Sequence, residues 1–419
     1  MKTLLRRLPF GLLACVAFLT GLSLAALWTV YPIDGDEGLA FAVLLRHYAF
    51  KQTLFLVLGL VGAAAVVVVP YRAFARIAWP LLAASVVALV ALRFLGRTIN
   101  GCRGWIVLGP FSLQPSEFVK IVVILALGRF MMYQKNLTSV RGLLGPFAVA
   151  AVPAGLILVQ PDLGTSMVFY PVLIGMLFVA GARRSHLALV LALTILSIPP
   201  AFFLLLKPYQ RDRLVGFISP GKAATDVDFQ PRQSTAVIAS AGLTGGGWND
   251  EDRFYALTVP FYHTDFIFAV VAEQTGWVGS SAVLAAYALL LALCLRIAWR
   301  TREPFGRLIV CGVAIVFGFQ AVVNLAMCTG SAPVTGITLP FMSYGGSSLW
   351  SSLLGLALVV NVAVHPTPSL AARDFAEGSG EIPRLRFNVT VNVWRKMDEE
   401  AGTLRDPSST RTKAVGIRQ

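Results

Sequence analysis

Two carboxylates lie at and inside a long apolar run near the middle of the chain. Asp265 ends a polar stretch, and Glu273 follows about two helical turns later in PFYHTDFIFAVVAEQ. An acid within a bilayer is costly unless it is paired or hydrated, so each of these residues is a candidate for function. The alternative for Asp265 is that it caps the helix that follows, together with Thr264. A helix N-terminus would lower the pKa of Asp265 and burial would raise it, and the sequence does not decide between them.

Glu117 and Lys120 form a second candidate pair, three positions apart at the start of another apolar run. Pro115 suits the first turn of a helix, so both side chains would lie on one helix face and form an ion pair. A pair that only lets a polar helix end enter the membrane explains the same spacing. Asp162 in QPDLGTS interrupts the next pair of runs, and we interpret it as a helix cap.

The longest polar stretch, residues 207–264, carries cations and a glycine string. Arg211 and Arg213 lie in PYQRDR, and Gln233 and Ser234 begin QSTAVIASAGLTGGGW. Glycine amides with arginines nearby suit a phosphate group. The string lacks the lysine-serine pair of a nucleotide-binding loop, so we expect no nucleotide site.

Two further polar loops carry candidate residues. Asn324 and Tyr344 lie in or beside a loop with neutral hydrogen-bonding groups, which suit sugar hydroxyls, although its serines would also cap the helix that follows. Arg103 lies in RFLGRTINGCRGWIVLGPFSLQPSEFVK. The aromatic and apolar side chains of this loop favour a position along the membrane interface.

The elements that must position these residues are membrane helices. Hydrophobic residues make up 56% of the 419 positions, charged residues 13%, and the mean hydropathy is +0.72, which is outside the range of soluble domains. Runs of about 20 apolar residues cross a bilayer. They predict an all-α polytopic protein with about ten transmembrane helices, near residues 9–30, 52–70, 77–95, 117–133, 142–160, 164–181, 187–206, 265–298, 307–328 and 346–365.

The net charge is +14, and the basic residues are spread over alternate loops rather than gathered in one stripe. Their positions indicate how the chain is oriented in the membrane. We therefore expect no nucleic-acid partner, and both termini in the cytoplasm. The long loop between helices 7 and 8 would face outward. Residues 1–366 would form the transmembrane domain and residues 367–419 a basic, disordered cytoplasmic tail.

Four separated motifs occur together in this chain: GWIVLGPFSLQPSEFVK, QPDLGTS, HTDFIFAVVAEQTGWVG and PVTGITLPFMSYGGSS. Their order and the ten expected helices closely resemble the SEDS family (shape, elongation, division and sporulation) over nearly all of residues 9–365. PVTGI, QPDLGT and PYQRDR look more like the rod-shape branch, RodA, than the division branch, FtsW.

The resemblance implies a peptidoglycan glycosyltransferase that polymerises lipid II at the outer face of the bacterial cytoplasmic (inner) membrane, for cell-wall elongation and cell shape. It implies as partners a class B penicillin-binding protein, which is a transpeptidase, and other membrane proteins of the elongation complex. Asp265 matches the family's catalytic aspartate, and Glu117 and Lys120 match its outer-leaflet pair. Gly104 departs from the pattern, because a basic residue is expected before Trp105. A lipid II flippase and a non-catalytic scaffold are the alternative functions.

In the implied reaction, a sugar hydroxyl attacks the anomeric carbon of a second lipid-linked disaccharide, and undecaprenyl pyrophosphate leaves. Asp265 would act as the base. The expected contacts to the pyrophosphate are Lys120, Arg103, Arg211 and Arg213. The other expected substrate contacts are Glu117, Gln233, Ser234 and Tyr344.

No cysteine or histidine cluster has the spacing of metal ligands, so we expect no metal site built by the protein alone. The sequence leaves open a divalent cation, Mg²⁺ or Mn²⁺, on the pyrophosphate with Asp265 or Glu117 as a ligand. Cys102 and Cys328 would both lie near the outer face, but a scatter of five cysteines does not indicate a disulfide.

Overall fold

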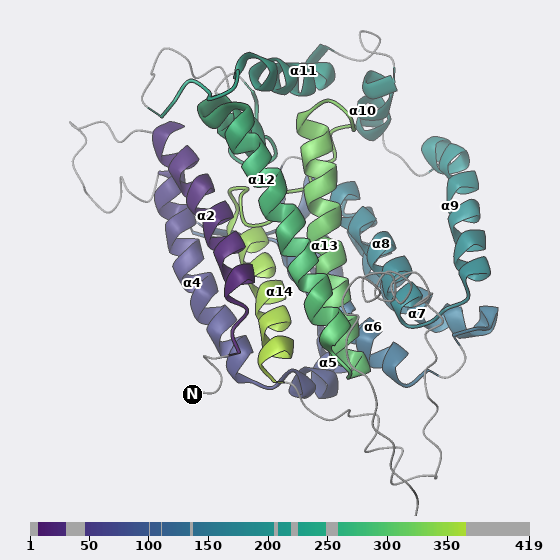
Figure 1. The fold of residues 1–419 in the computed structure, drawn as a ribbon. Helices are drawn as coiled ribbons and strands as arrows, with labels where there is room; N and C mark the ends of the chain where they lie inside the picture. The colour runs from purple at the N-terminus through teal and green to yellow at the C-terminus, as the bar shows by residue number, and fades with distance from the viewer. Residues whose placement is uncertain are drawn as a thin grey trace, which may run out of the picture. The chain divides into compact units, whose positions relative to one another are not determined.

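The computed structural model describes residues 7–30, 47–99, 101–109, 111–134, 137–204, 208–218, 225–248 and 259–365. The expected disordered tail, residues 367–419, lies outside the described residues. Within them, ten helices of 17 residues or more form a bundle (Figure 1). They are α2 (Phe10–Val30), α4 (Tyr48–Val68), α5 (Tyr71–Leu95), α6 (Pro115–Met132), α7 (Val140–Val159), α8 (Leu163–Val179), α9 (Arg184–Leu204), α12 (Ile267–Arg300), α13 (Pro304–Cys328) and α14 (Gly346–Val364).

Each of the ten predicted apolar runs coincides with one of these helices, so the expected all-α polytopic architecture is confirmed. Seven of them, all but α6, α8 and α9, are long and apolar enough by length and composition to cross a membrane. The start of α2 lies at the lower end of the bundle in Figure 1. Two shorter helices in the predicted long loop, α10 (Pro208–Ile218) and α11 (Thr225–Ser240), lie at the upper end.

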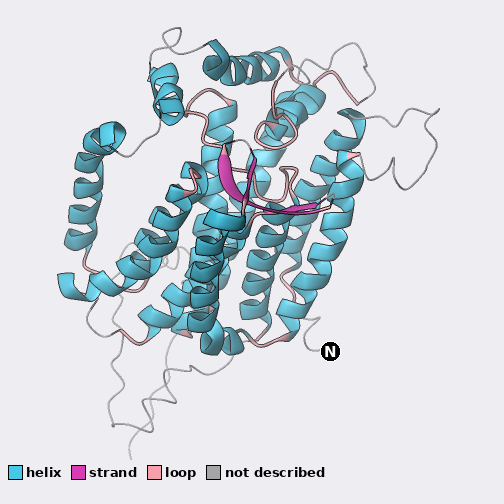
Figure 2. Ribbon diagram, turned by 180° about the vertical axis from the view of Figure 1, so that it is seen from behind, coloured by secondary structure: helices cyan, strands magenta, loops and turns pink. Residues whose placement is uncertain are grey.

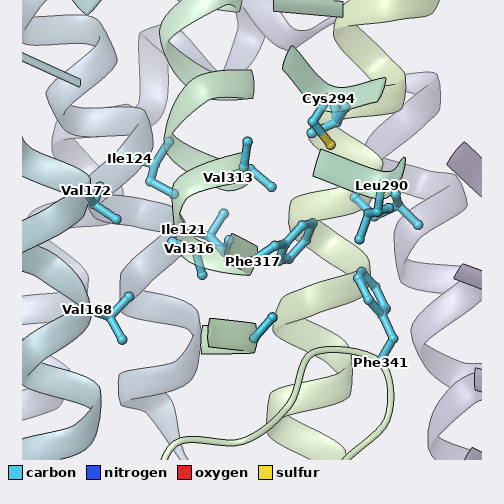
Figure 3. Close-up of a cluster of buried hydrophobic side chains, with 14 of the residues drawn as sticks. Ile121, Ile124, Val168, Val172, Leu290, Cys294, Val313, Val316, Phe317 and Phe341 are labelled. Carbon is cyan, nitrogen blue, oxygen red and sulfur yellow. The ribbon is translucent and has the colours of Figure 1, made fainter. Parts of the chain in front are cut away.

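The charged helix α6 is enclosed by its neighbours rather than exposed to lipid. It contacts α5, α7, α8, α13 and α14. Ile121 and Ile124 of α6 belong to a buried cluster with Val168 of α8 and Val313 and Phe317 of α13, as Figure 3 shows. A helix that carries charges is stable in a membrane when neighbouring helices cover it, and this packing accounts for the position of α6.

A small antiparallel sheet, which the sequence did not predict, precedes α6. Its strands are β1 (Arg97–Ile99), β2 (Cys102–Leu108) and β3 (Phe111–Leu113), in the order β1-β2-β3. Figure 2 shows them in magenta in the upper half of the bundle. Gly101 allows the tight turn between the first two strands with a φ of 78°. The sequence predicted only that this segment lies along the membrane interface, from its aromatic and apolar side chains.

The long helix α12 is broken at Gly276, where φ is 65° and ψ is −158°. The glycine string that follows α11 packs against this break. The amides of Gly246 and Gly247 donate to the carbonyls of Glu273 and Gln274, at 2.8 Å and 3.1 Å. The prediction that this string holds a phosphate is therefore wrong for these two amides, since they satisfy helix carbonyls.

Candidate functional site

Asp265 lies in a tight turn before α12 and does not cap that helix. The helix begins at Ile267, its N-cap is Phe266, and no side chain makes a capping hydrogen bond there. The Asp265 amide donates instead to the carbonyl of Phe261 at 3.0 Å. Phe261 has a φ of 59°, which is rare for a residue other than glycine. The cap interpretation is therefore wrong, and the Asp265 carboxylate is available for another role.

The backbone of Asp265 is fastened from α13. The side-chain amide of Asn324 donates to the Asp265 carbonyl at 2.8 Å and to the Ile337 carbonyl at 2.8 Å. Asn324 is completely buried. The sequence placed Asn324 among groups for sugar hydroxyls, but its two donors are used inside the protein.

The surroundings of Asp265 favour its protonated form compared with an exposed aspartate. Burial raises the pKa of the Asp265 carboxyl from its ordinary value of 3.8 to about 6. The Arg213 cation and a hydrogen bond from Thr264 act to lower this pKa, and the negative charge of Asp162 acts to raise it. A carboxyl with a pKa near the working pH has the properties of a general base.

A second charged group lies at the start of α6. Lys120 Nζ and Glu117 Oε2 form an ion pair at 2.8 Å, and the two residues are 3% and 6% exposed. Ser351 of α14 donates to the same carboxylate oxygen at 3.1 Å. The predicted pairing of Glu117 and Lys120 is confirmed. Because this ion pair is buried between α6 and α14, it contributes to the packing of these helices.

Asp162 interacts electrostatically with Asp265 and with the Glu117–Lys120 pair. Its Oδ1 accepts the Thr165 amide at 3.0 Å, which confirms the predicted helix cap. Its Oδ2 accepts the side-chain amide of Gln114, just before α6, at 2.9 Å. Burial raises the pKa of Asp162, and the charges of Glu117 and Lys120 also act on it. The sequence indicated the cap but not that Asp162 lies within electrostatic reach of Asp265.

A cavity of about 500 Å³ opens at the upper end of the bundle. Its walls come from α10, from α11 and from the loop after α13. Arg213, Arg232 and Thr235 line it together with Thr329 and Val334. Arg213 Nη1 donates to the Val334 carbonyl at 3.3 Å. The positive charge of Arg213 also lowers the pKa of Asp265. This arginine therefore lines the cavity and acts electrostatically on the candidate base.

Three of the predicted substrate contacts bind the protein itself. Arg103 donates to the carbonyls of Gly96 and Phe94, at 3.1 Å and 3.0 Å. Arg211 donates to the Phe203 carbonyl at 2.6 Å. Ser234 is fully buried and donates to the Cys328 carbonyl at 2.8 Å. Gln233 lies half-buried on α11 and is not among the residues that line the cavity.

Gly104 has a structural reason to lack a side chain. A Cβ at this position would lie 3.0 Å from Oε1 of Gln160. The preceding residue, Arg103, donates its amide to the Gln160 carbonyl at 3.3 Å. The sheet thus packs on the end of α7 at the point where the family pattern led us to expect a basic residue.

Tyr344 belongs to an aromatic cluster near Asp265. Its ring lies edge-on to Tyr48 at 4.9 Å and packs against His263 at 5.7 Å, and its amide donates to the His263 carbonyl at 2.9 Å. Burial lowers the pKa of His263 to about 4, so this ring is neutral near pH 7. A ring with a pKa this low is a weak base at pH 7, which favours a positioning role for His263 over that of a second base.

The part of the chain that the structure describes contains no group of three or more His, Cys, Asp and Glu side chains that could hold a metal ion. A divalent cation would therefore need oxygen ligands from a bound substrate. In the same part of the chain, all five cysteines are free.

Comparisons with known proteins identify the family of the chain. Residues 11–367 match the profile of the family described as "Cell cycle protein", FTSW_RODA_SPOVE. The match covers most of the chain. This chain belongs to the FtsW, RodA and SpoVE family. The family is the SEDS family whose motifs the sequence contains.

Members of this family resemble the chain over most of their own length. The "Probable peptidoglycan glycosyltransferase FtsW" of Thiomicrospira cyclica is 38% identical over 328 residues, which cover 75% of this chain and 82% of that protein. The "Stage V sporulation protein E" of Bacillus subtilis is 33% identical over 359 residues, which cover 84% of this chain and 94% of that protein.

Solved structures show the same fold. The structure described as "Structural coordination of polymerization and crosslinking by a peptidoglycan synthase complex" contains a chain that is 34% identical, with a TM-score of 0.73 over 85% of this chain and 97% of that chain. The rod shape determining protein RodA of Thermus thermophilus is 31% identical, with a TM-score of 0.63 over 85% of this chain and 96% of that chain.

Proposed function

We propose that this SEDS-family chain is a peptidoglycan glycosyltransferase that polymerises lipid II. The observation that carries the proposal is a candidate base that feels the charge of an arginine in the wall of a cationic cavity. Asp265 has a pKa raised to about 6, and Arg213, which acts on Asp265, also lines the cavity of about 500 Å³. A glycosyl transfer with a pyrophosphate leaving group needs both features.

The proposed step begins with a sugar hydroxyl of one lipid-linked disaccharide. Asp265 accepts the proton of this hydroxyl, whose oxygen forms a bond to the anomeric carbon of a second lipid-linked disaccharide. The bond from that carbon to the pyrophosphate oxygen breaks, and undecaprenyl pyrophosphate leaves with the electron pair. Arg213 and Arg232 line the cavity and supply the positive charge that stabilises the leaving group.

The remaining charged groups position this centre. Lys120 is paired with buried Glu117, and Asp162 interacts electrostatically with this pair and with Asp265. We assign Glu117 and Lys120 to the packing of α6 and to the field around Asp162. The backbone amide of Tyr344 donates a hydrogen bond to the carbonyl of His263, two residues before Asp265, and so fixes this turn.

We propose that the upper end of the bundle faces outward from the bacterial inner membrane and that both termini are cytoplasmic. The start of α5, the start of α9 and the end of α12 lie at the lower end of the bundle in Figure 1. These helix ends carry Arg76, Arg184 and Arg300, which supports this orientation. A class B penicillin-binding protein is the proposed partner. The related chain in a peptidoglycan synthase complex supports this pairing.

We also propose that the chain serves cell elongation with other membrane proteins of that complex, as its PVTGI and PYQRDR strings favour. The two relatives above are named FtsW and stage V sporulation protein E, whereas the Thermus thermophilus neighbour is named a rod shape determining protein. Rescue of cell shape in a strain depleted of its rod-shape protein, without rescue of a division-depleted strain, tests this assignment. The reverse pattern would assign the chain to division.

The experiment that tests the function is lipid II polymerisation by the purified chain with its class B partner. We expect wild type to form glycan strands and Asp265→Asn to form none at equal thermal stability. Asp212→Asn is the matched control, because Asp212 is an exposed acid on α10 at the same end of the bundle. Equal activity of wild type and Asp265→Asn would remove Asp265 as the base. Strands from neither protein would favour the flippase or scaffold function.

A further inference from the structure

A second cavity lies at the lower end of the bundle, far along the helices from Asp265. Its volume is about 830 Å³. Its walls come from the segment before α2, the end of α12, the start of α13 and the ends of α5 and α14 nearest to them. We call it the arginine pocket, after the four arginines that line it: Arg7, Arg296, Arg300 and Arg302.

The arginine pocket is strongly cationic. Its four guanidinium groups are exposed, and none makes a hydrogen bond or ion pair with another described residue. Its one acidic residue, Glu303, is 2% exposed and uses Oε2 to cap α13 through the Gly306 amide. The positive charge therefore exceeds the negative charge, and an anion in the pocket would find unpaired donors.

The other wall of the arginine pocket is apolar. Leu12 of α2, Leu293 and Ile297 of α12 and Val362 of α14 line it beside the arginines. Helices α2 and α12 pack side by side over this region. An inorganic anion would use only the arginines, whereas a molecule with a phosphate and a hydrocarbon chain would use both walls. Basic pockets between membrane helices have this chemistry when they bind anionic lipids.

We propose that the arginine pocket binds the head group of an anionic phospholipid, with the phosphate against Arg296 and Arg300 and an acyl chain along Leu12 and Ile297. The site is separate from the proposed glycosyltransferase centre and does not depend on it. In the proposed orientation it faces the cytoplasmic leaflet. Its occupancy would fasten the end of α12 to the segment before α2.

The test uses the full-length purified protein and native mass spectrometry. Phosphatidylglycerol, which carries net negative charge, is compared with phosphatidylcholine, which carries none, and with inorganic phosphate. We expect phosphatidylglycerol to bind with defined stoichiometry, and Arg296→Gln/Arg300→Gln to weaken this binding about 30-fold. The matched control is Arg183→Gln/Arg184→Gln, two exposed arginines at the same end of the bundle and outside the pocket, which should leave binding unchanged.

A measurement on wild type keeps the proposal falsifiable if the double variant does not fold. A photoactivatable phosphatidylglycerol should label peptides from residues 7–12 and 293–302 in excess over the rest of the lower end. Equal labelling of peptides around Arg183 would overturn the proposal. Equal binding of phosphatidylcholine, or complete displacement by inorganic phosphate, would also overturn it, because the site would then not select an anionic lipid.

Discussion

The side-chain amide of Asn324 holds the backbone of the candidate base, through a hydrogen bond of 2.8 Å to the Asp265 carbonyl. The same amide group reaches the Ile337 carbonyl, so one residue on α13 joins the turn before α12 to the loop before α14. The position of Asp265 therefore depends on a polar contact in a fully buried place.

Replacement of this residue, Asn324→Leu, should reduce both stability and polymerisation. Two buried carbonyls would lose their donors, at a cost of about 1–3 kcal/mol each. We expect the thermal unfolding temperature in detergent to fall and kcat to fall more than KM rises. Val322 lies two residues before Asn324 and its side chain is 65% exposed. It offers a control, because Val322→Leu should change neither the unfolding temperature nor kcat. Full activity of Asn324→Leu would show that the turn keeps its geometry without this contact.

Polymerisation should depend on the ionised form of Asp265. Because a base must be deprotonated and the pKa of this carboxyl is about 6, kcat/KM should rise with pH through about 6 and be lost below it. Removal of the Arg213 cation, which lowers this pKa, should move the acidic limb to higher pH in Arg213→Gln. Arg213→Lys keeps the charge and should keep the limb. A pH profile without a limb near 6 in wild type would contradict this assignment.

The Glu117–Lys120 pair should show strong coupling in a double-mutant cycle. Lys120→Met alone leaves a buried carboxylate without its cation, which destabilises a protein by about 3–5 kcal/mol. Glu117→Gln/Lys120→Met removes both charges and should unfold at a higher temperature than Lys120→Met. The measurement is thermal or denaturant unfolding of the purified variants. Additive effects of the two single changes would mean that the ion pair contributes nothing to stability.

The break in α12 should tolerate no side chain. A Cβ at Gly276 would lie 2.3 Å from the Gly245 amide nitrogen, and its φ of 65° disfavours other residues. We expect Gly276→Ala to lower the unfolding temperature and the rate of polymerisation. Gly62→Ala on α4 is the control, because a Cβ there meets nothing within 4 Å and alanine favours helix. Equal stability of both variants would show that the glycine string after α11 can move to make room for a side chain at Gly276.

Any effect of a divalent cation should appear only with substrate. Since no described group of three ligands can hold a metal ion, a cation would bind through the pyrophosphate and a carboxylate such as Asp265. A chelator should therefore leave the unfolding temperature of the substrate-free protein unchanged. If chelation also leaves lipid II polymerisation unchanged, the cation has no part in the reaction.

Local patterns in the sequence were sufficient for the helices and for two contacts. Apolar runs identified all ten long helices, and the spacing of Glu117 and Lys120 predicted their ion pair, because the partners are one helical turn apart. Asp162 before an apolar run predicted its cap for the same reason. These features depend on neighbours along the chain.

The wrong expectations concern contacts between distant segments. Asp265 resembles a helix cap in sequence, but a hydrogen bond from Asn324 and the charge of Arg213, both from other parts of the chain, act on it. The glycine string resembles a phosphate loop, but its amides bind the opened turn of α12. The structure also shows backbone partners for the side chains of Arg103 and Ser234, and their contact with substrate stays a prediction.

The break at Gly276 also determines how deep Asp265 lies. At about 1.5 Å per residue, the 34 residues of α12 would extend about 51 Å, whereas the hydrocarbon of a bilayer is about 30 Å thick. The 24 residues from Trp277 to Arg300 extend about 36 Å and suffice for a crossing. The short upper piece can then lie at the level of the head groups. There the charged end of a lipid-linked sugar reaches Asp265 without leaving its leaflet.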